Sequence, residues 1–334
     1  MRSRESNDMI SSEREVSAVL YVVPDYYRDF RCIAGACQHS CCIGWEIDID
    51  DETATYYRTL DGALGDRLRE HIAWEDPPHF VLGEKERCPF LNGHNLCDII
   101  TELGEERLCG ICSDHPRFRN ELPGRIETGI GLCCEEAARL ILSRKEPVRL
   151  LAEGEDEAQD EILALRDEVI LLLQERTRPV SERVEEMLHL CGASVPKRTT
   201  GEWCEFLLTL ERLDETWTKE LEHLRDSWQE IDLYGFDQYM VSRQTEYEQL
   251  LVYLVYRHLA NAADEVDLAA RAAFAAWGFE LVRILGALTW QETGELPFAR
   301  QQELARLFSS ELEYSEENLE QLLDVLAWGE ADML

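Results

Sequence analysis

Residues 269–290 read AARAAFAAWGFELVRILGALTW and form the most apolar window in a chain of 334 residues. Arg271, Glu280 and Arg283 fall inside this window, and ionisable side chains are costly at the centre of a lipid bilayer. A helix that is apolar on most of its sides is typical of the centre of a helical bundle. The window therefore predicts a buried core helix and not a membrane span.

Helical spacing of apolar residues extends over the sequence on both sides of this window, from about residue 147 onward. The stripe from Phe206 to Trp228 keeps a spacing of three and four residues over several turns. No alternation of strands and helices, which would indicate a parallel sheet, interrupts the pattern. The expected fold is mainly α, with a cysteine-rich metal-binding N-terminal domain that contains little strand and an all-α helical bundle after it. The expected helices of the bundle include residues 162–172, 206–228, 247–258, 269–290, 297–307 and 315–328.

The N-terminal third has a different composition. Ten of the twelve cysteines lie between Cys32 and Cys134, among many Gly, Pro and His residues that are typical of loops. The alternation over residues 43–50 predicts a short strand or an extended stretch. We expect a flexible N-terminal lead-in over residues 1–20, a cysteine-rich domain over residues 21–146 and a helical domain over residues 147–334.

The cysteines need a chemical explanation, because buried free cysteine behaves as an ordinary small apolar residue and would not gather in one third of a chain. Residues 1–14 lack the apolar run of a signal peptide, so we expect a cytoplasmic protein whose thiols stay reduced. Metal binding is then favoured over disulfides. Closed zinc and iron–sulfur sites each need about four thiolates, and the spacing leaves both metals, and one site or two, open.

Several other polar residues receive a simpler interpretation. His39, His94 and His115 could bind zinc, but we interpret them as polar loop residues because the thiols suffice. Cys191 and Cys204 are expected to pack inside the bundle. The glycine-rich run over residues 127–131 lacks a surrounding strand–helix–strand unit, so it does not predict a dinucleotide fold.

The formal net charge is −35, from 33 Lys and Arg against 68 Asp and Glu. A chain this acidic is repelled by nucleic acids and by anionic membrane surfaces. It suits basic partners, such as protein segments that carry lysine. We therefore expect no nucleic-acid partner and no membrane partner, while the oligomeric state stays open.

Segments spread over the chain resemble the FliB family, the flagellin lysine-N-methylases. In the N-terminal half these segments are 30–32, Cys37, 41–45, 88–91, 96–99, 104–105, 108–109, Cys112 and 116–117. Residues 134–139 resemble the family segment S-C-P-E-A-A-R, with Cys133 in place of serine and Glu135 in place of proline. Residues 253–258 match a typical family stretch, and residues 313–319 resemble E-H-S-x-x-N-L with Tyr314 where histidine is usual.

This resemblance covers nearly all of residues 21–325, while the N-terminal half alone is also similar to cysteine-cluster proteins of the YkgJ type. It implies transfer of a methyl group from S-adenosylmethionine to lysine side chains of flagellin. It also implies a cysteine-bound iron–sulfur cluster, expected to be of the [4Fe-4S] type, with zinc as the alternative metal. The implied ligands are Cys32, Cys37, Cys41, Cys42, Cys88, Cys97, Cys109, Cys112 and Cys134.

Two other functions are open to the same residues. The chain could be a non-enzymatic scaffold that binds zinc or a cluster and docks a partner through its helical half. A redox sensor built on Cys109 and Cys112 is disfavoured, because such pairs normally sit at a helix N-terminus beside a sheet. Catalytic residues and the residues that bind S-adenosylmethionine are not predicted. Tyr253, Tyr256 and Tyr314 fall in family-like segments, and we interpret them mainly as packing residues.

Overall fold

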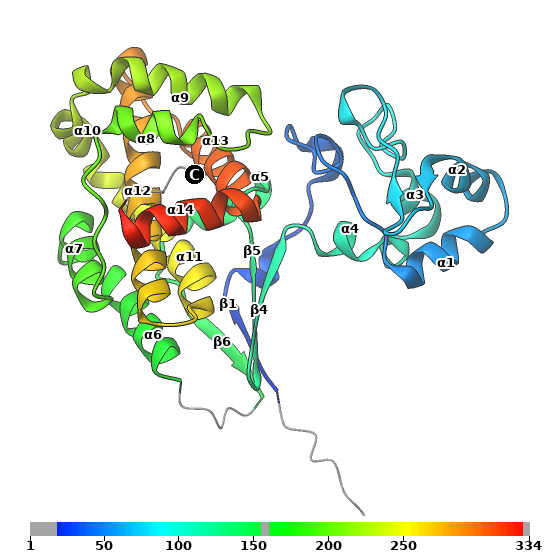
Figure 1. Cartoon of the computed structure of the whole chain (residues 1–334), viewed down its shortest axis with the longest axis horizontal. Coiled ribbons are helices and arrows are strands. Elements are labelled where there is room, and N and C mark those ends of the chain that lie inside the picture. The colour runs from blue at the N-terminus through cyan, green and yellow to red at the C-terminus, as the bar shows by residue number, and fades with distance from the viewer. Residues whose placement is uncertain (1–18, 155–159, 330–334) are drawn as a thin grey trace, which may run out of the picture.

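The computed structural model describes residues 19–154 and 160–329, so residues 1–18 of the predicted lead-in lie outside the described residues. Figure 1 shows two parts. A body of packed helices lies against a small sheet, and a cysteine-rich module, residues 31–116, projects to one side of it. The chain enters the module after its first strand and returns to the body through the strand that follows Pro116.

The body is helical, and its core is centred on α11 and α12, which contribute most of their residues to the buried interior. The mainly α architecture predicted from the sequence is confirmed. The helices of the body are α5 (Glu135–Ser143), α6 (Glu161–Leu173), α7 (Val180–Leu190), α8 (Thr200–Leu207), α9 (Glu215–Ser227), α10 (Leu233–Met240), α11 (Gln244–His258), α12 (Glu265–Thr293), α13 (Phe298–Phe308) and α14 (Glu316–Trp328).

Helix α12 is the core helix that the apolar window predicts. The Asp264 side chain caps its N-terminus by accepting the backbone N–H groups of Val266 and Asp267, and the helix ends at Gly294, whose φ is +83°. Among the described residues it is the one helix long and apolar enough to cross a membrane, and 83% of its most apolar window is buried inside the protein. Its apolar surface is thus covered by neighbouring helices.

The apolar stripe from Phe206 to Trp228 is not one continuous helix, and that prediction is wrong. Helix α8 ends at Leu207 and α9 begins after its N-cap, Asp214. The carboxylate of Glu311 accepts the backbone N–H groups of Leu213, at 2.9 Å, and Asp214, at 2.8 Å. Leu210 is buried within the intervening loop, so the spacing of apolar residues continues across a break that periodicity cannot detect.

A four-stranded sheet, which the sequence analysis does not predict, packs against α11. The strand order is β4-β5-β1-β6, and β1 runs parallel to β5 while the other two pairs are antiparallel. The Tyr256 hydroxyl on α11 contacts the carbonyl oxygens of Val22 and Thr128 at 3.1 and 3.2 Å. Strand β6 lies after residue 147, where the sequence analysis expects only helices, and is an exception to that expectation. The strands are β1 (Leu20–Pro24), β4 (Arg117–Leu122), β5 (Arg125–Ile130) and β6 (Leu150–Glu153).

The cysteine-rich module has its own small core, formed around Tyr57, Phe80 and Phe90. Residues 43–50 form no strand: Gly44 and Trp45 lie in a bend, Ile43 and Asp48 form isolated bridges, and Ile47 and Ile49 are buried in this core. The regular elements are short because loops occupy much of the module. They are α1 (Asp51–Thr59), α2 (Ala63–His71), β2 (Ile72–Ala73), β3 (His79–Phe80), α3 (Asp98–Leu103) and α4 (Gly110–Asp114).

The sheet is tied to the helices by a buried ion pair between β5 and α6. Both side chains are fully buried, and the Arg166 guanidinium makes two contacts of 2.7 Å to the Glu127 carboxylate. Arg166 also contacts Asp167 at the surface, where the carboxylate is 49% exposed. The ion pair between Arg166 and Glu127 is therefore shielded from water, whereas the pair between Arg166 and Asp167 is not.

We expect Glu127→Gln to lower the free energy of unfolding by about 3 kcal/mol, because it removes the buried carboxylate that Arg166 and Arg125 both contact and leaves Arg166 with only the half-exposed Asp167 as counter-charge. Asp167→Asn is the matched control, and it should cost at most about 1 kcal/mol because its carboxylate is half exposed. Urea unfolding of both variants measures the difference. Equal losses in the two variants would contradict the prediction.

Candidate functional site

The nine predicted thiol ligands divide into two groups in the structure. Five of them, the inner thiol group, belong to the core of the module or pack against it. The backbone N–H of Cys88 donates to the carbonyl of Cys42 at 2.8 Å, and Cys97 forms an isolated bridge with Leu91. The inner thiol group consists of Cys42, Cys88, Cys97, Cys109 and Cys112.

The other four, the outer thiol group, lie where the loop over residues 31–41 meets the start of α5. The Glu135 carboxylate contacts the Cys37 thiol at 3.5 Å and accepts the backbone N–H of Gln38 at 2.8 Å. His39 on the same loop contacts Glu303 of α13 at 3.1 Å. The loop is therefore attached to the helical body at two points. The outer thiol group consists of Cys32, Cys37, Cys41 and Cys134.

The surroundings of the thiols shift their pKa values. Burial raises the pKa of Cys37 and of Cys88 to about 12. The two groups meet at Cys41 and Cys42, whose thiols are hydrogen bonded. That bond raises the pKa of Cys41, and the neighbouring Cys32 and Cys134 thiols add to this rise. The same bond lowers the pKa of Cys42 to about 7. Metal ligation would remove the thiol protons of Cys37, Cys41 and Cys88, whose pKa values are raised.

The spacing of the thiols can be compared with what a metal requires. Thiolates about 2.3 Å from a tetrahedral zinc ion are about 3.8 Å apart. In the part of the chain that the structure describes, no three cysteine sulfurs lie within 4.8 Å of one another. A cluster spreads its thiolates over several irons, so the wider spacing is compatible with one. Each group has at least the four soft donors that a closed centre needs, so the donor chemistry fits both metals, while the spacing fits a cluster better than a zinc ion.

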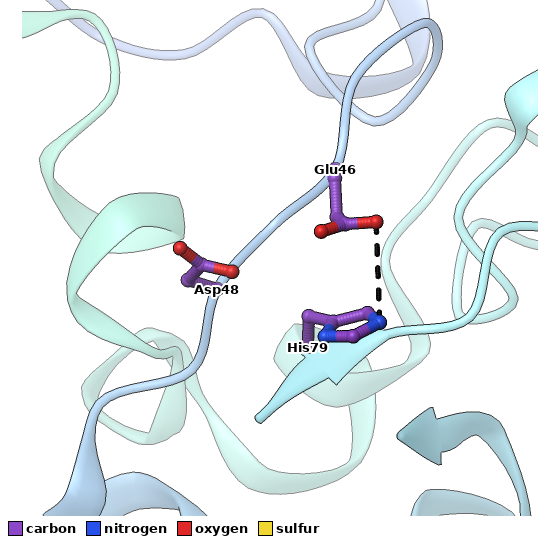
Figure 2. A group of neighbouring side chains, drawn as sticks. All are labelled: Glu46, Asp48 and His79. Carbon is purple, nitrogen blue, oxygen red and sulfur yellow. Dashed lines mark ion pairs between the residues drawn. The ribbon is translucent and has the colours of Figure 1, made fainter. Parts of the chain in front are cut away.

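One set of three potential ligand atoms does lie within 4.8 Å, and it is formed by Glu46, Asp48 and His79 (Figure 2). The His79 Nε2 atom is 3.9 Å from Glu46, while its Nδ1 lies 3.1 Å from the Pro77 carbonyl. The Glu46 side chain is 65% exposed. Ordinary surface ion pairing accounts for this arrangement.

A pocket of about 860 Å³ lies between the module and the body, and both parts line it. Three aromatic rings follow one another along it, with centroids 6.0 Å apart for Trp45 and His115 and 6.4 Å apart for His115 and Tyr314. Cys41 of the outer thiol group lines it too, and the Trp45 indole donates to the Cys41 carbonyl at 2.8 Å. The carboxylate-bearing residues that line it are Glu86, Asp114, Asp214, Glu215 and Glu311.

Tyr314 is held in place from two sides. Its hydroxyl donates to the Pro116 carbonyl at 3.0 Å, and the Arg257 guanidinium lies 4.4 Å from its ring centroid. A Cβ atom on Gly131 would lie 1.9 Å from the Tyr314 hydroxyl oxygen, so this ring position requires glycine there. Cys133, two residues after Gly131, also lines the pocket.

Behind Tyr314, a buried polar network joins segments that are distant in sequence. The Glu313 carboxylate contacts His258 Nε2 at 2.7 Å and the Tyr253 hydroxyl at 3.1 Å. Burial alone would raise the pKa of Glu313, but the charge of Arg257 and the contact with His258 outweigh it, and the pKa is lowered. The family-like segments 253–258 and 313–319 thus meet directly.

The sequence identified some of these residues and missed others. Tyr253 and Tyr256 are packing residues, as interpreted, but Tyr314 lines the pocket. Cys133, Trp45 and the pocket carboxylates were not predicted as site residues, although Trp45 lies in the family-like segment 41–45 and Cys133 lies next to the predicted ligand Cys134. Cys191 and Cys204 are buried in the body, as expected, His94 is exposed in a loop, and His115 lines the pocket.

The His115 imidazole should stay neutral throughout the physiological range, because burial and, to a smaller extent, Arg117 lower its pKa to about 4. An unfolded histidine titrates near pH 6.5, so the unfolded state binds the proton first. His115 therefore costs stability as the pH falls from about 6.5 toward 4. Histidine NMR resonances, assigned with a His115→Asn variant, check this: a His115 midpoint near pH 6.5 would contradict it.

Comparison with known proteins finds similarity in the C-terminal part of the chain. Residues 195–332 match the family model described as the FliB lysine N-methylase C-terminal domain. The lysine-N-methylases of Salmonella choleraesuis (strain SC-B67) and Salmonella typhimurium (strain LT2) are 28% and 27% identical to this chain over 134 residues. The flagellar biosynthetic protein FliU of Salmonella muenchen is 26% identical over 134 residues.

The extent of these matches is limited. Each covers 38% of this chain, and the aligned part spans 33% of the two methylases and 79% of the flagellar biosynthetic protein. No solved structure matches the chain. The similarity to YkgJ-type proteins receives no support from these comparisons. The predicted resemblance to the FliB family is confirmed through residues 195–332, which match its lysine N-methylase C-terminal domain.

Proposed function

We propose that this chain methylates lysine side chains of a flagellar protein, flagellin, with S-adenosylmethionine as the methyl donor, and that the pocket between module and body is the active site. The observation that carries the proposal is the composition of this pocket. The FliB-like domain supplies Arg306, Glu311 and Tyr314, while the cysteine-rich module supplies Cys41 and Trp45. Both parts therefore contribute side chains to one site.

The charge and the aromatic lining of the pocket suit both reactants. A lysine ammonium group and the sulfonium of S-adenosylmethionine are cations, and cations are attracted to carboxylates and to the faces of aromatic rings. Trp45 and Tyr314 present such faces in the same pocket as Asp114, Asp214 and Glu215. The net charge of −35 supports a basic protein segment as substrate, and argues against nucleic acid or an anionic membrane surface as partner.

The transfer requires a neutral lysine, since only the free amine has the lone pair that forms the new N–C bond as the S–C bond breaks. A pocket with little water lowers the pKa of the lysine and so helps to release its proton. Of the carboxylates, Glu311 is occupied by two backbone N–H groups and Asp114 by the Arg119 guanidinium. Asp214 caps α9 through Oδ1, which accepts the backbone N–H of Thr216 at 2.7 Å. Its Oδ2 is 3.8 Å from Arg306 and makes no hydrogen bond to the described residues, and this oxygen is the one we propose as proton acceptor.

We propose that cysteines of the predicted set hold an iron–sulfur cluster of the [4Fe-4S] type, with zinc as the alternative metal. Cys41 places the outer thiol group at the edge of the pocket. A bound cluster would supply a redox-active metal centre beside the reactants. The surrounding residues bind and orient the substrate and exclude water. We also propose a cytoplasmic location, where thiols remain available for metal.

The first experiment tests the activity itself. Protein purified without oxygen is incubated with S-adenosylmethionine and flagellin from the same organism, and intact-mass spectrometry follows the flagellin. We expect its mass to rise in steps of one methyl group, with the modified residues mapped to lysine. Unchanged flagellin with fully metal-loaded protein would overturn the proposal and favour the non-enzymatic scaffold.

The second experiment tests the pocket. Trp45→Ala should slow methylation roughly two- to fivefold, because a cation–π contact with a partly exposed ring, here 36% exposed, is worth about 0.5–1 kcal/mol. The matched control is Trp328→Ala, since Trp328 is 71% exposed at the end of α14 and outside the pocket. Equal rates in the two variants, with unchanged metal content, would place the active site elsewhere.

A further inference from the structure

The inner thiol group is separate from the pocket. Cys88 and Cys109 are 6% and 0% exposed, and none of the five inner cysteines is among the residues that line the pocket. Their sulfurs face the module's own core instead. A site formed by these residues would be closed to substrate, which is typical of structural metal centres.

The inner thiols come from four separate stretches of the module. Cys42 precedes the segment 43–50, Cys88 and Cys97 flank a loop before α3, and Cys109 and Cys112 lie at and within α4. The backbone N–H of Cys88 donates to the Cys42 carbonyl at 2.8 Å, and all five inner cysteines lie in or pack on the one core of the module. One metal centre bound here would therefore cross-link the segment at Cys42, the loop before α3 and the start of α4.

The module has a physical need for such a cross-link. Its core contains thirteen buried residues, two of which are cysteines, and its strands β2 and β3 have two residues each. Apolar burial on this scale contributes little stability, and small folds with small cores commonly depend on disulfides or bound metal. All cysteines of the chain are free thiols, so metal is the available means.

The number of thiols also favours two centres. A closed centre uses about four thiolates, and the nine candidates divide into groups of five and four. Cys41 and Cys42 are neighbours in sequence, but Cys41 lines the pocket, with Cys32 and Cys134 beside it, whereas Cys42 packs on the module core. A single centre would leave five reduced thiols crowded together without a role.

We propose that the inner thiol group, Cys42, Cys88, Cys97, Cys109 and Cys112, supplies four thiolates to a second, structural metal centre that holds the module together, distinct from the centre of the outer thiol group at the pocket. The metal is thiophilic, either a zinc ion or a second iron–sulfur cluster. Binding replaces thiol protons by metal–sulfur bonds without any change in oxidation state of the sulfurs. The proposal does not rest on the methylation activity.

Metal analysis of the full-length protein, purified without oxygen, tests this. Iron, zinc and acid-labile sulfide per chain are measured in the unaltered protein, in the double variant Cys88→Ser/Cys97→Ser, which leaves three inner thiols, and in Cys32→Ser and Cys204→Ser. The first two variants should each lose the metal of one centre and keep that of the other, and Cys204→Ser, a buried cysteine of the body, should lose none. Zinc lost from Cys88→Ser/Cys97→Ser identifies an ion, and iron with sulfide identifies a cluster.

A second measurement avoids variants that fail to fold. Iodoacetamide labelling of the unaltered protein, with the labelled cysteines mapped by mass spectrometry, should leave the inner thiols protected until a chelator removes the metal. The module should then become sensitive to protease while the helical body stays resistant. The proposal is overturned if Cys88→Ser/Cys97→Ser keeps its full metal content, if Cys32→Ser loses all metal, or if the inner thiols of metal-loaded protein react at once.

Discussion

The buried carboxylate of Glu313 is the contact on which the arrangement of the pocket depends. It lies at the end of the π-helical turn Ser309–Glu313, and its partners Arg257 and His258 belong to the last turn of α11. A buried carboxylate is tolerated only where charge and hydrogen bonds compensate for lost hydration. This requirement fixes the turn against α11 and directs the next residue, Tyr314, toward the cysteine-rich module.

One of the places where the module contacts the body is the start of α5. Glu135 receives the loop of the outer thiol group through its side chain, while its backbone carbonyl accepts from Gln302 of α13. The same residue therefore connects the thiol loop to the helices that the FliB-like match covers. The pocket and the outer thiols share this anchoring, so disturbance of one would reach the other.

Much of the fold could be predicted from the sequence, because long helices leave a strong periodic signal. Helix α12 and its buried character followed from the residues at 269–290. The break between α8 and α9 could not be predicted, since Leu210 maintains the apolar spacing inside a loop. The small sheet was missed because β1 and β5 pair across about a hundred residues, and pairing between distant strands leaves no local pattern.

The sequence identified the cysteines of the site but not their division into an inner and an outer group. Cys41 and Cys42 are neighbours in sequence, and only the fold places them beside different residues. The pocket likewise depends on two residues that are distant in sequence, Gly131 and Tyr314. Gly131 leaves the space that the Tyr314 hydroxyl occupies. These two positions are therefore not free to vary independently: a larger residue at 131 is compatible with the fold only if the side chain at 314 becomes shorter, so the two should change together over evolutionary time.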